Sequence, residues 1–176
     1  IWRPIPEPST RVNALLGGEV DMIAAVPPDN VNEIKNEGLD VEMGTHPHIW
    51  WLNVNHNELP FSNLKVRQAV NFAINKKGMA ETLLRNTALP AFSMVSRTSA
   101  AWNKNWVDPY PYNPEKAKDL LNEAGYPNGF STTFQTSTAG SGQILPVQMA
   151  EWIQRDLAKV GINLKLETYE WNTYVG

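Results

Sequence analysis

The chain has 176 residues, of which 42% are hydrophobic and 19% charged, the proportions of an ordinary globular protein. Its net charge of -3 argues against a nucleic-acid partner, because phosphate binding needs a clustered basic surface and the densest positive run is only the pair Lys76 and Lys77. The absence of cysteine excludes disulfides, thiol catalysis and thiolate metal sites, and no apolar stretch is long enough to span a bilayer.

The first third of the chain alternates predicted helices and strands. Ser9 or Thr10 is a candidate cap for a first helix that ends at Gly17, and Asp29 is a candidate cap for a second that ends at Gly38. Strands are expected at residues 20–26, 41–44 and 49–54. This third therefore has the pattern of an α/β protein.

The middle of the chain combines a strong helix with a long loop. Apolar residues at helical spacing predict an amphipathic helix from Val66 to Ile74, followed by a short helix that runs to about Leu84. Residues 87–112 show no sustained period and contain Trp102 and Trp106. A loop of this length is uncommon unless it is functional.

The last third has the pattern of a βαβ unit. Asn113 and Pro114 predict the start of a helix that ends at Gly125. A strand at 130–136, a helix at 146–160 and a strand from Ile162 follow. A crossover of this length joins parallel strands.

This unit indicates a candidate ligand site, because ligands of open α/β sheets lie beyond the carboxyl ends of parallel strands. Small hydroxyl residues and glycines occupy that position, where they can hydrogen-bond a polar ligand: Thr136, Ser137, Thr138, Gly140 and Ser141. The segment lacks the Gly-Lys-Ser/Thr ending of a nucleotide-binding loop. A plain flexible connection is the alternative interpretation.

Tryptophans are the second group of candidate binding residues, since aromatic side chains supply much of the area of ligand pockets. Trp50 and Trp51 lie on a predicted strand, so their rings should point to opposite faces, and Trp51 is the one assigned to a cleft. Trp102, in the long loop, and Trp171 complete the set, while Trp152 is expected in the core. Core packing is the alternative for all of them.

No pattern indicates metal binding or catalysis. His46 and His48 could bind one metal ion from the two sides of Pro47. No third ligand lies at a spacing typical of a metal site, so surface histidines are the preferred interpretation. The chain has no Gly-x-Ser-x-Gly elbow. The carboxylate pair Glu19 and Asp21 suits a solvated strand better than acid–base work. We therefore expect no enzyme, no metal and no cofactor.

Four phrases in fixed order resemble family 5 of the extracellular solute-binding proteins, the peptide- and nickel-binding class of ABC importers. Within the second and third of these phrases, the most specific segments are PF-x-x-x-x-VRQAVNFAIN and YPYNPEKAKDLLNEAGY. The four phrases are RVNALLGGEVDMI (11–23), LPFSNLKVRQAVNFAINKKGM (59–79), YPYNPEKAKDLLNEAGYPNGF (110–130) and MAEWIQRDLAKVGINLKLETYEWNTY (149–174).

The resemblance implies a fold and a domain division. Members have the two-lobed type II periplasmic-binding-protein fold, an α/β architecture of mixed sheets with flanking helices. Residues 1–55 would belong to the first lobe and the return through the hinge, and residues 56–176 would begin the second major lobe. We accordingly expect a fragment of a longer protein that contains half of a cleft.

The resemblance also implies a function, namely capture of a peptide by hinge closure and its delivery to the membrane permease. The receptor would be periplasmic or extracytoplasmic, free or lipid-anchored, and monomeric. In dipeptide-binding members the loop matching 136–141 can offer an arginine to the peptide carboxylate, and this loop has none. A receptor for oligosaccharides or another non-peptide solute is the alternative, and an independent α/β interaction or enzymatic domain is a distant one.

Overall fold

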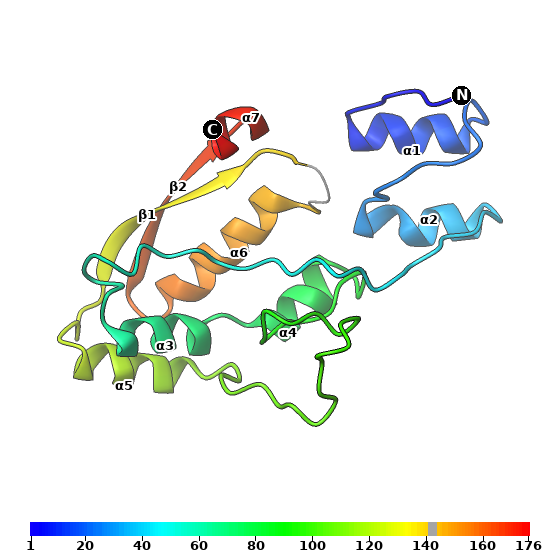
Figure 1. The fold of residues 1–176 in the computed structure, drawn as a ribbon. Coiled ribbons are helices and arrows are strands. Elements are labelled where there is room, and N and C mark those ends of the chain that lie inside the picture. The colour runs from blue at the N-terminus through cyan, green and yellow to red at the C-terminus, as the bar shows by residue number, and fades with distance from the viewer. Residues whose placement is uncertain (141–143) are drawn as a thin grey trace.

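Two groups of elements, joined by a single irregular stretch, make up the computed structural model, which describes residues 1–140 and 144–176 (Figure 1). The N-terminal group contains α1 (Pro8–Leu16), the 3-10 turn η1 (Pro28–Asn30) and α2 (Val31–Asn36). The larger group contains α3 (Leu64–Ala73), α4 (Lys76–Gly78), the π-helical turn η2 (Met79–Leu83), α5 (Pro114–Glu123), β1 (Phe130–Ser137), α6 (Pro146–Ala158), β2 (Ile162–Tyr169) and α7 (Trp171–Val175). No helix in the described ranges has the length and apolarity that a membrane crossing requires.

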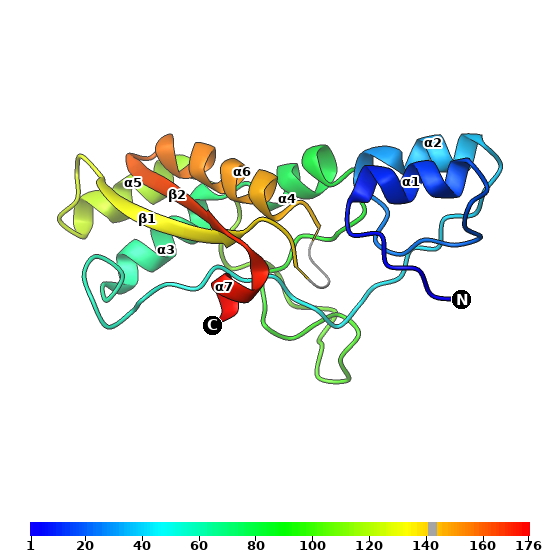
Figure 2. The ribbon, with the colours of Figure 1, turned by 90° about the horizontal axis from the view of Figure 1, so that it is seen from above.

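The predicted βαβ unit is confirmed. β1 and β2 pair in parallel, from Phe130 opposite Ile162 to Ser137 opposite Tyr169. The helix that connects them, α6, lies along one face of this two-stranded sheet (Figure 2). The two strands start at a close approach of Gly129 and Gly161, both with positive φ.

The core of the larger group lies between α3, α5, α6 and the inner face of the sheet. The helical spacing predicted for α3 is confirmed, since Val66, Ala69, Val70 and Ala73 are all buried. The other members of this cluster come from the turn after α3, from η2, from α5 and from the end of α6 into β2: Ile74, Met79, Ala117, Leu120, Leu121, Leu157, Val160 and Ile162. One continuous apolar cluster therefore holds the βαβ unit against the α3–α5 pair.

A buried carboxylate connects α6 to the turn between α3 and α4. Asp156 is only 1% exposed. It accepts a hydrogen bond of 2.9 Å from the backbone N–H of Asn75 and one of 2.7 Å from Lys159 Nζ. The first of these bonds joins two elements that are far apart in the sequence, so Asp156 fixes their relative position.

The three strands predicted in the first third of the chain are wrong. Residues 20–26, 41–44 and 49–54 form no strand, and Ala25 has a positive φ of 54°. Strands need a partner that satisfies their backbone groups, and the backbone of residues 47–56 makes no hydrogen bond to another backbone group of the described chain. Trp50 and Trp51 are both exposed, so neither ring lies in the core as the predicted strand required of one of them.

The N-terminal caps of the first two helices also differ from the prediction. Glu7, and neither Ser9 nor Thr10, caps α1. Its carboxylate accepts a hydrogen bond of 2.6 Å from the Thr10 backbone N–H, and it also accepts from the hydroxyls of Ser9 and Thr10. Asp29 does not cap α2; its carboxylate forms an ion pair of 2.8 Å with Arg85 instead. Asn113, by contrast, caps α5 as predicted.

Candidate functional site

The carboxyl end of β1 brings together most of the residues predicted to bind a ligand. Thr136 and Ser137 are buried, at 9% and 0% exposed, so their hydroxyls lie within the fold. The Thr138 N–H donates to the Tyr169 carbonyl oxygen over 2.8 Å, which extends the pairing one residue beyond β1. Gly140 follows and is half-buried, and Ser141 lies outside the described residues.

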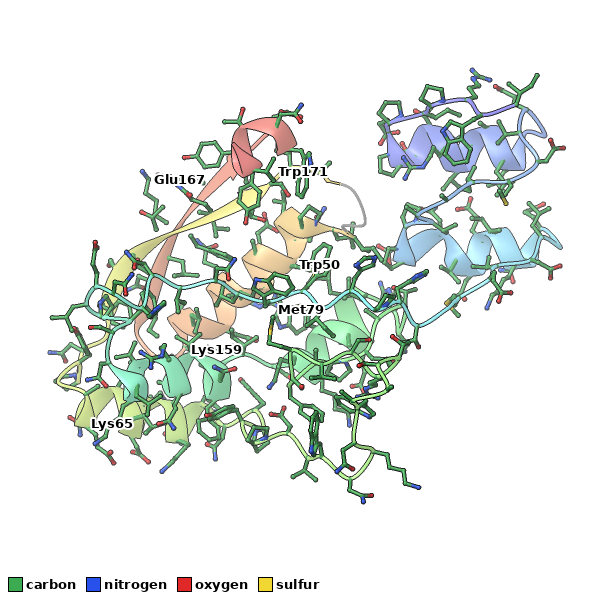
Figure 3. All side chains as sticks on the ribbon, in the orientation of Figure 1. Trp50, Lys65, Met79, Lys159, Glu167 and Trp171 are labelled. Atoms are coloured by element: carbon green, nitrogen blue, oxygen red, sulfur yellow. The ribbon has the colours of Figure 1, made fainter. Side chains whose placement is uncertain are left out.

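Trp171 joins this group from α7, the helix that follows β2. It begins α7, which contacts β1, and it lies at the end of the sheet where α6 starts (Figure 3). Its ring lies 6.2 Å from that of Tyr174. Glu170 caps α7 by accepting a hydrogen bond of 2.9 Å from the Asn172 backbone N–H, so the helix that carries Trp171 has a defined start.

The other two predicted tryptophans lie elsewhere. Trp51 is 58% exposed on the stretch between the two groups of elements. Trp102 belongs to an aromatic cluster in the long loop, with ring centroids 5.5 Å from Phe92 and 5.5 Å from Trp106. Arg97 lies over the Trp102 ring at 5.7 Å. Trp102 therefore packs within the long loop, while Tyr110 near the end of the loop contacts Phe72 of α3.

A network of paired polar groups covers the outer face of the sheet near this end. Glu167 accepts from Lys165 Nζ and from the Tyr169 hydroxyl, each over 2.9 Å. The hydrogen bond from Lys165 is the main cause of a lowered pKa for Glu167, and the same contacts with Glu167 raise the pKa of Lys165 and of Tyr169. Mutual pairing of this kind is typical of a structural network.

A first cavity of about 220 Å³ lies between the stretch that precedes α3 and the sheet. Apolar side chains from both sides dominate its lining, among them Leu52, Val54, Phe61, Phe134 and Leu164. None of the seven predicted site residues that the structure describes lines it. The cavity follows the middle of β1, whereas the predicted residues gather at its end.

A second cavity, of about 340 Å³, lies between the two groups of elements and was not predicted. Residues from η1, η2, the turn after η2 and α6 line it, and most of them are charged or polar: Asp29, Thr82, Leu83, Arg85, Gln148, Glu151, Trp152 and Arg155. Helical spacing assigned Trp152 to the core, and its ring does pack against the core cluster. Sequence reasoning had no signal for the cavity itself, because its walls come from residues more than 100 positions apart.

The described residues bring no three metal-ligating side chains together. The rings of His46 and His48 stack at 6.5 Å. The groups that the site offers are thus hydroxyls, backbone amides, an indole and, in the second cavity, guanidinium groups. Such groups bind a polar ligand by hydrogen bonding and stacking.

Comparison with known proteins gives a single family. The model of the bacterial extracellular solute-binding proteins, family 5, matches residues 1–176. Heme-binding protein A of Haemophilus influenzae is 36% identical over an alignment of 180 positions, which covers 97% of this chain and 31% of the relative. Glutathione-binding protein GsiB of Shigella flexneri is 34% identical over 167 residues, 94% of this chain and 31% of the relative. The chain thus spans about a third of the length of these relatives.

Solved structures of periplasmic binding proteins share the fold. The periplasmic binding protein DppA of Helicobacter pylori, in complex with the peptide STSA, superposes with a TM-score of 0.80 at 33% identity. The match covers 98% of this chain and 33% of that protein. The expected fold class, part of the type II periplasmic-binding-protein fold, is confirmed.

Proposed function

The chain belongs to family 5 of the bacterial extracellular solute-binding proteins, and from this membership we propose that it forms part of the substrate-binding component of an ABC importer. The relatives are binding proteins and not enzymes, which supports a role in capture without chemistry. In this role the longer protein hands its solute to the membrane subunits of a permease.

A peptide is the solute we propose. The observation that carries this choice is the superposition, over 98% of the chain, on a periplasmic binding protein that holds the peptide STSA. Glutathione-binding protein, another relative, is named for a peptide-like solute and points in the same direction. The hydroxyls and amides at the end of β1 suit a ligand recognised through its backbone groups.

Hinge closure between two lobes is the mechanism we propose. Residues 1–55 would supply part of the first lobe and the return through the hinge, and residues 56–176 the start of the second lobe. A ligand that contacts both lobes stabilises the closed state over the open one, and only this difference shifts the population. Thr136, Ser137, Thr138, Gly140 and Trp171 are the proposed contacts from the second lobe, with Trp51 and Trp102 at the edges of the cleft.

The proposed location is periplasmic or extracytoplasmic, in keeping with the periplasmic relatives. A lipid anchor is the finer alternative to a receptor that diffuses freely. The relatives do not favour the oligosaccharide receptor, because those compared above are named for heme, glutathione and a peptide.

Mass spectrometry of small molecules released from the purified longer protein tests the peptide assignment. Recovery of short peptides supports it. Recovery of an oligosaccharide or a heme, with no peptide, contradicts the peptide assignment while leaving the receptor role in place. A matched sample from a Thr136→Val, Thr138→Val variant should release less peptide if the end of β1 contacts the solute.

A further inference from the structure

Arg155 differs from every other arginine of the chain in its surroundings. The other five each donate to a carboxylate or a backbone carbonyl oxygen: Arg3, Arg11, Arg67, Arg85 and Arg97. Arg155 has no oxygen partner among the described residues. Its only recorded interaction there is with the Trp152 ring, whose centroid lies 4.4 Å from its guanidinium carbon.

Stacking on Trp152 prepares the guanidinium for a ligand. The indole packs against the core cluster, so the surface on which Arg155 rests is fixed. An arginine stacked on an aromatic ring loses little hydration and keeps the N–H groups at its edge free to donate. These donors form a planar fork that matches a carboxylate.

The surroundings provide room for such a ligand. Arg155 and Trp152 line the cavity of about 340 Å³, and Asp29 and Arg85 also line it. Asp29 and Arg85 satisfy each other through their ion pair of 2.8 Å. Glu151, one turn before Arg155 on α6, lines the same cavity but makes no ion pair with Arg155 in the described structure. Arg155 is therefore the cation of this cavity that remains available.

We propose that this cavity binds a carboxylate through the guanidinium of Arg155. Asp29 and Glu151 offset the charge of the two arginines, so the site favours a monovalent carboxylate with the planar geometry of the fork over a highly charged anion. Walls from both groups of elements make the site sensitive to their separation. In the receptor proposed above, the carboxylate belongs to the captured solute, and this last assignment rests on that proposed function.

Titration of the chain with sodium acetate tests the site, followed in nitrogen–proton NMR spectra through the Arg155 Nε–H resonance and through the backbone amide resonances of α6. The amide resonances also report the acetate affinity of variants that lack Arg155. Acetate should shift the Arg155 resonance saturably, and neutral acetamide or matched sodium chloride should not. Arg155→Gln should weaken acetate binding about tenfold or more, the usual scale for loss of a charge-assisted pair. Trp152→Leu, which removes the stacking surface, should weaken it less.

Arg97→Gln is the matched control, because Arg97 also lies over a tryptophan, Trp102, but donates to the Pro90 carbonyl. It should leave acetate binding unchanged. An Arg155 resonance that acetate does not move, or equal acetate affinity in the chain and in Arg155→Gln, would overturn the site.

Trialanine and its C-terminal amide separate this proposal from the proposed function. A response of Arg155 to trialanine but not to the amide supports both. Equal binding of the two peptides without a response of Arg155 overturns the solute carboxylate assignment and leaves the peptide receptor in place. Binding of acetate at Arg155, with neither peptide bound by the chain or by the longer protein, supports the carboxylate site and contradicts the peptide assignment.

Discussion

At the scale of single residues, two carboxylates stabilise local structure by accepting hydrogen bonds from backbone N–H groups. Asp156 is buried and joins α6 to the start of α4, while Glu7 closes the first turn of α1 from the surface. Each accepts a backbone N–H that the local helix or turn leaves without a partner. Both contacts lead to a measurable prediction.

Asp156→Ala should destabilise the fold by about 2 kcal/mol, because the Asn75 N–H would lose a charged acceptor in a buried site. Asp156→Asn keeps an acceptor and should cost about half as much. Urea unfolding followed by circular dichroism measures the difference. Glu115→Ala is the control: its ion pair with Lys118 is exposed, and we expect a change within about 0.5 kcal/mol. Equal stability of Asp156→Ala and the unaltered chain would refute the role given to Asp156.

Glu7 predicts how α1 responds to acid. Hydrogen bonds from the Ser9 hydroxyl, then from the Thr10 backbone N–H and hydroxyl, lower its pKa from 4.5 to about 2. The folded pKa lies below the unfolded one, so this contribution to stability is present above pH 4.5 and is lost as the pH falls towards 2. The protection of the α1 amides from exchange, relative to the intrinsic exchange rate at each pH, should fall over that window, and Glu7→Gln should remove this pH dependence. A Glu7 carboxyl that titrates near 4.5 in NMR spectra would contradict the capping geometry.

At the scale of elements, helices were predictable from the sequence and isolated strands were not. Helix signals are local: Asn113 and Pro114 begin α5, and the spacing of Val66, Ala69 and Ala73 identifies the buried face of α3. A strand depends on a neighbour, and residues 49–54 alternate in burial at Leu52 and Val54 without a partner in the described chain. β1 and β2 were predictable because each supplies the other's partner.

Substitution of Gly129 tests the close contact between Gly129 and Gly161 at the start of β1 and β2. It has a φ of +70°, and a Cβ at this position would collide with the Gly161 carbonyl oxygen. Gly129→Ala should therefore cost about 3 kcal/mol through backbone strain and steric conflict. Gly38 has a similar φ of +80°, but a Cβ added there would meet no atom within 4 Å. Gly38→Ala therefore measures backbone strain alone and should cost about 1 kcal/mol. Equal unfolding free energies for the two variants would show that the Gly129–Gly161 contact is unimportant.

At the scale of the whole molecule, the chain consists of two groups of elements joined by one stretch without regular structure (Figure 1). The end of β1 was predictable as a candidate site because the βαβ pattern indicates where strands finish. Trp171 lies at the same edge because it follows β2, whose last residue, Tyr169, pairs with Ser137. The separate positions of Trp51 and Trp102, by contrast, depend on tertiary contacts that no local pattern encodes. The cavity at Arg155 was unpredictable for the same reason, since Asp29 reaches it from the other group of elements.

Hinge closure is the central claim at this scale, and a ligand with contacts on only one lobe could not produce it.

Trp171→Ala should weaken peptide binding by the longer protein about tenfold if its ring contacts the solute, since buried aromatic anchors contribute at this level or above. Trp106→Ala, a change in the self-packed loop cluster, is the matched control and should leave the affinity within about twofold. Isothermal titration measures both.

The most direct test of the account is small-angle X-ray scattering of the longer protein with and without a saturating short peptide. Closure of two lobes over the ligand predicts a smaller radius of gyration in the presence of the peptide, and no change with acetate alone. A peptide that binds by titration but leaves the scattering profile unchanged would contradict capture by hinge closure.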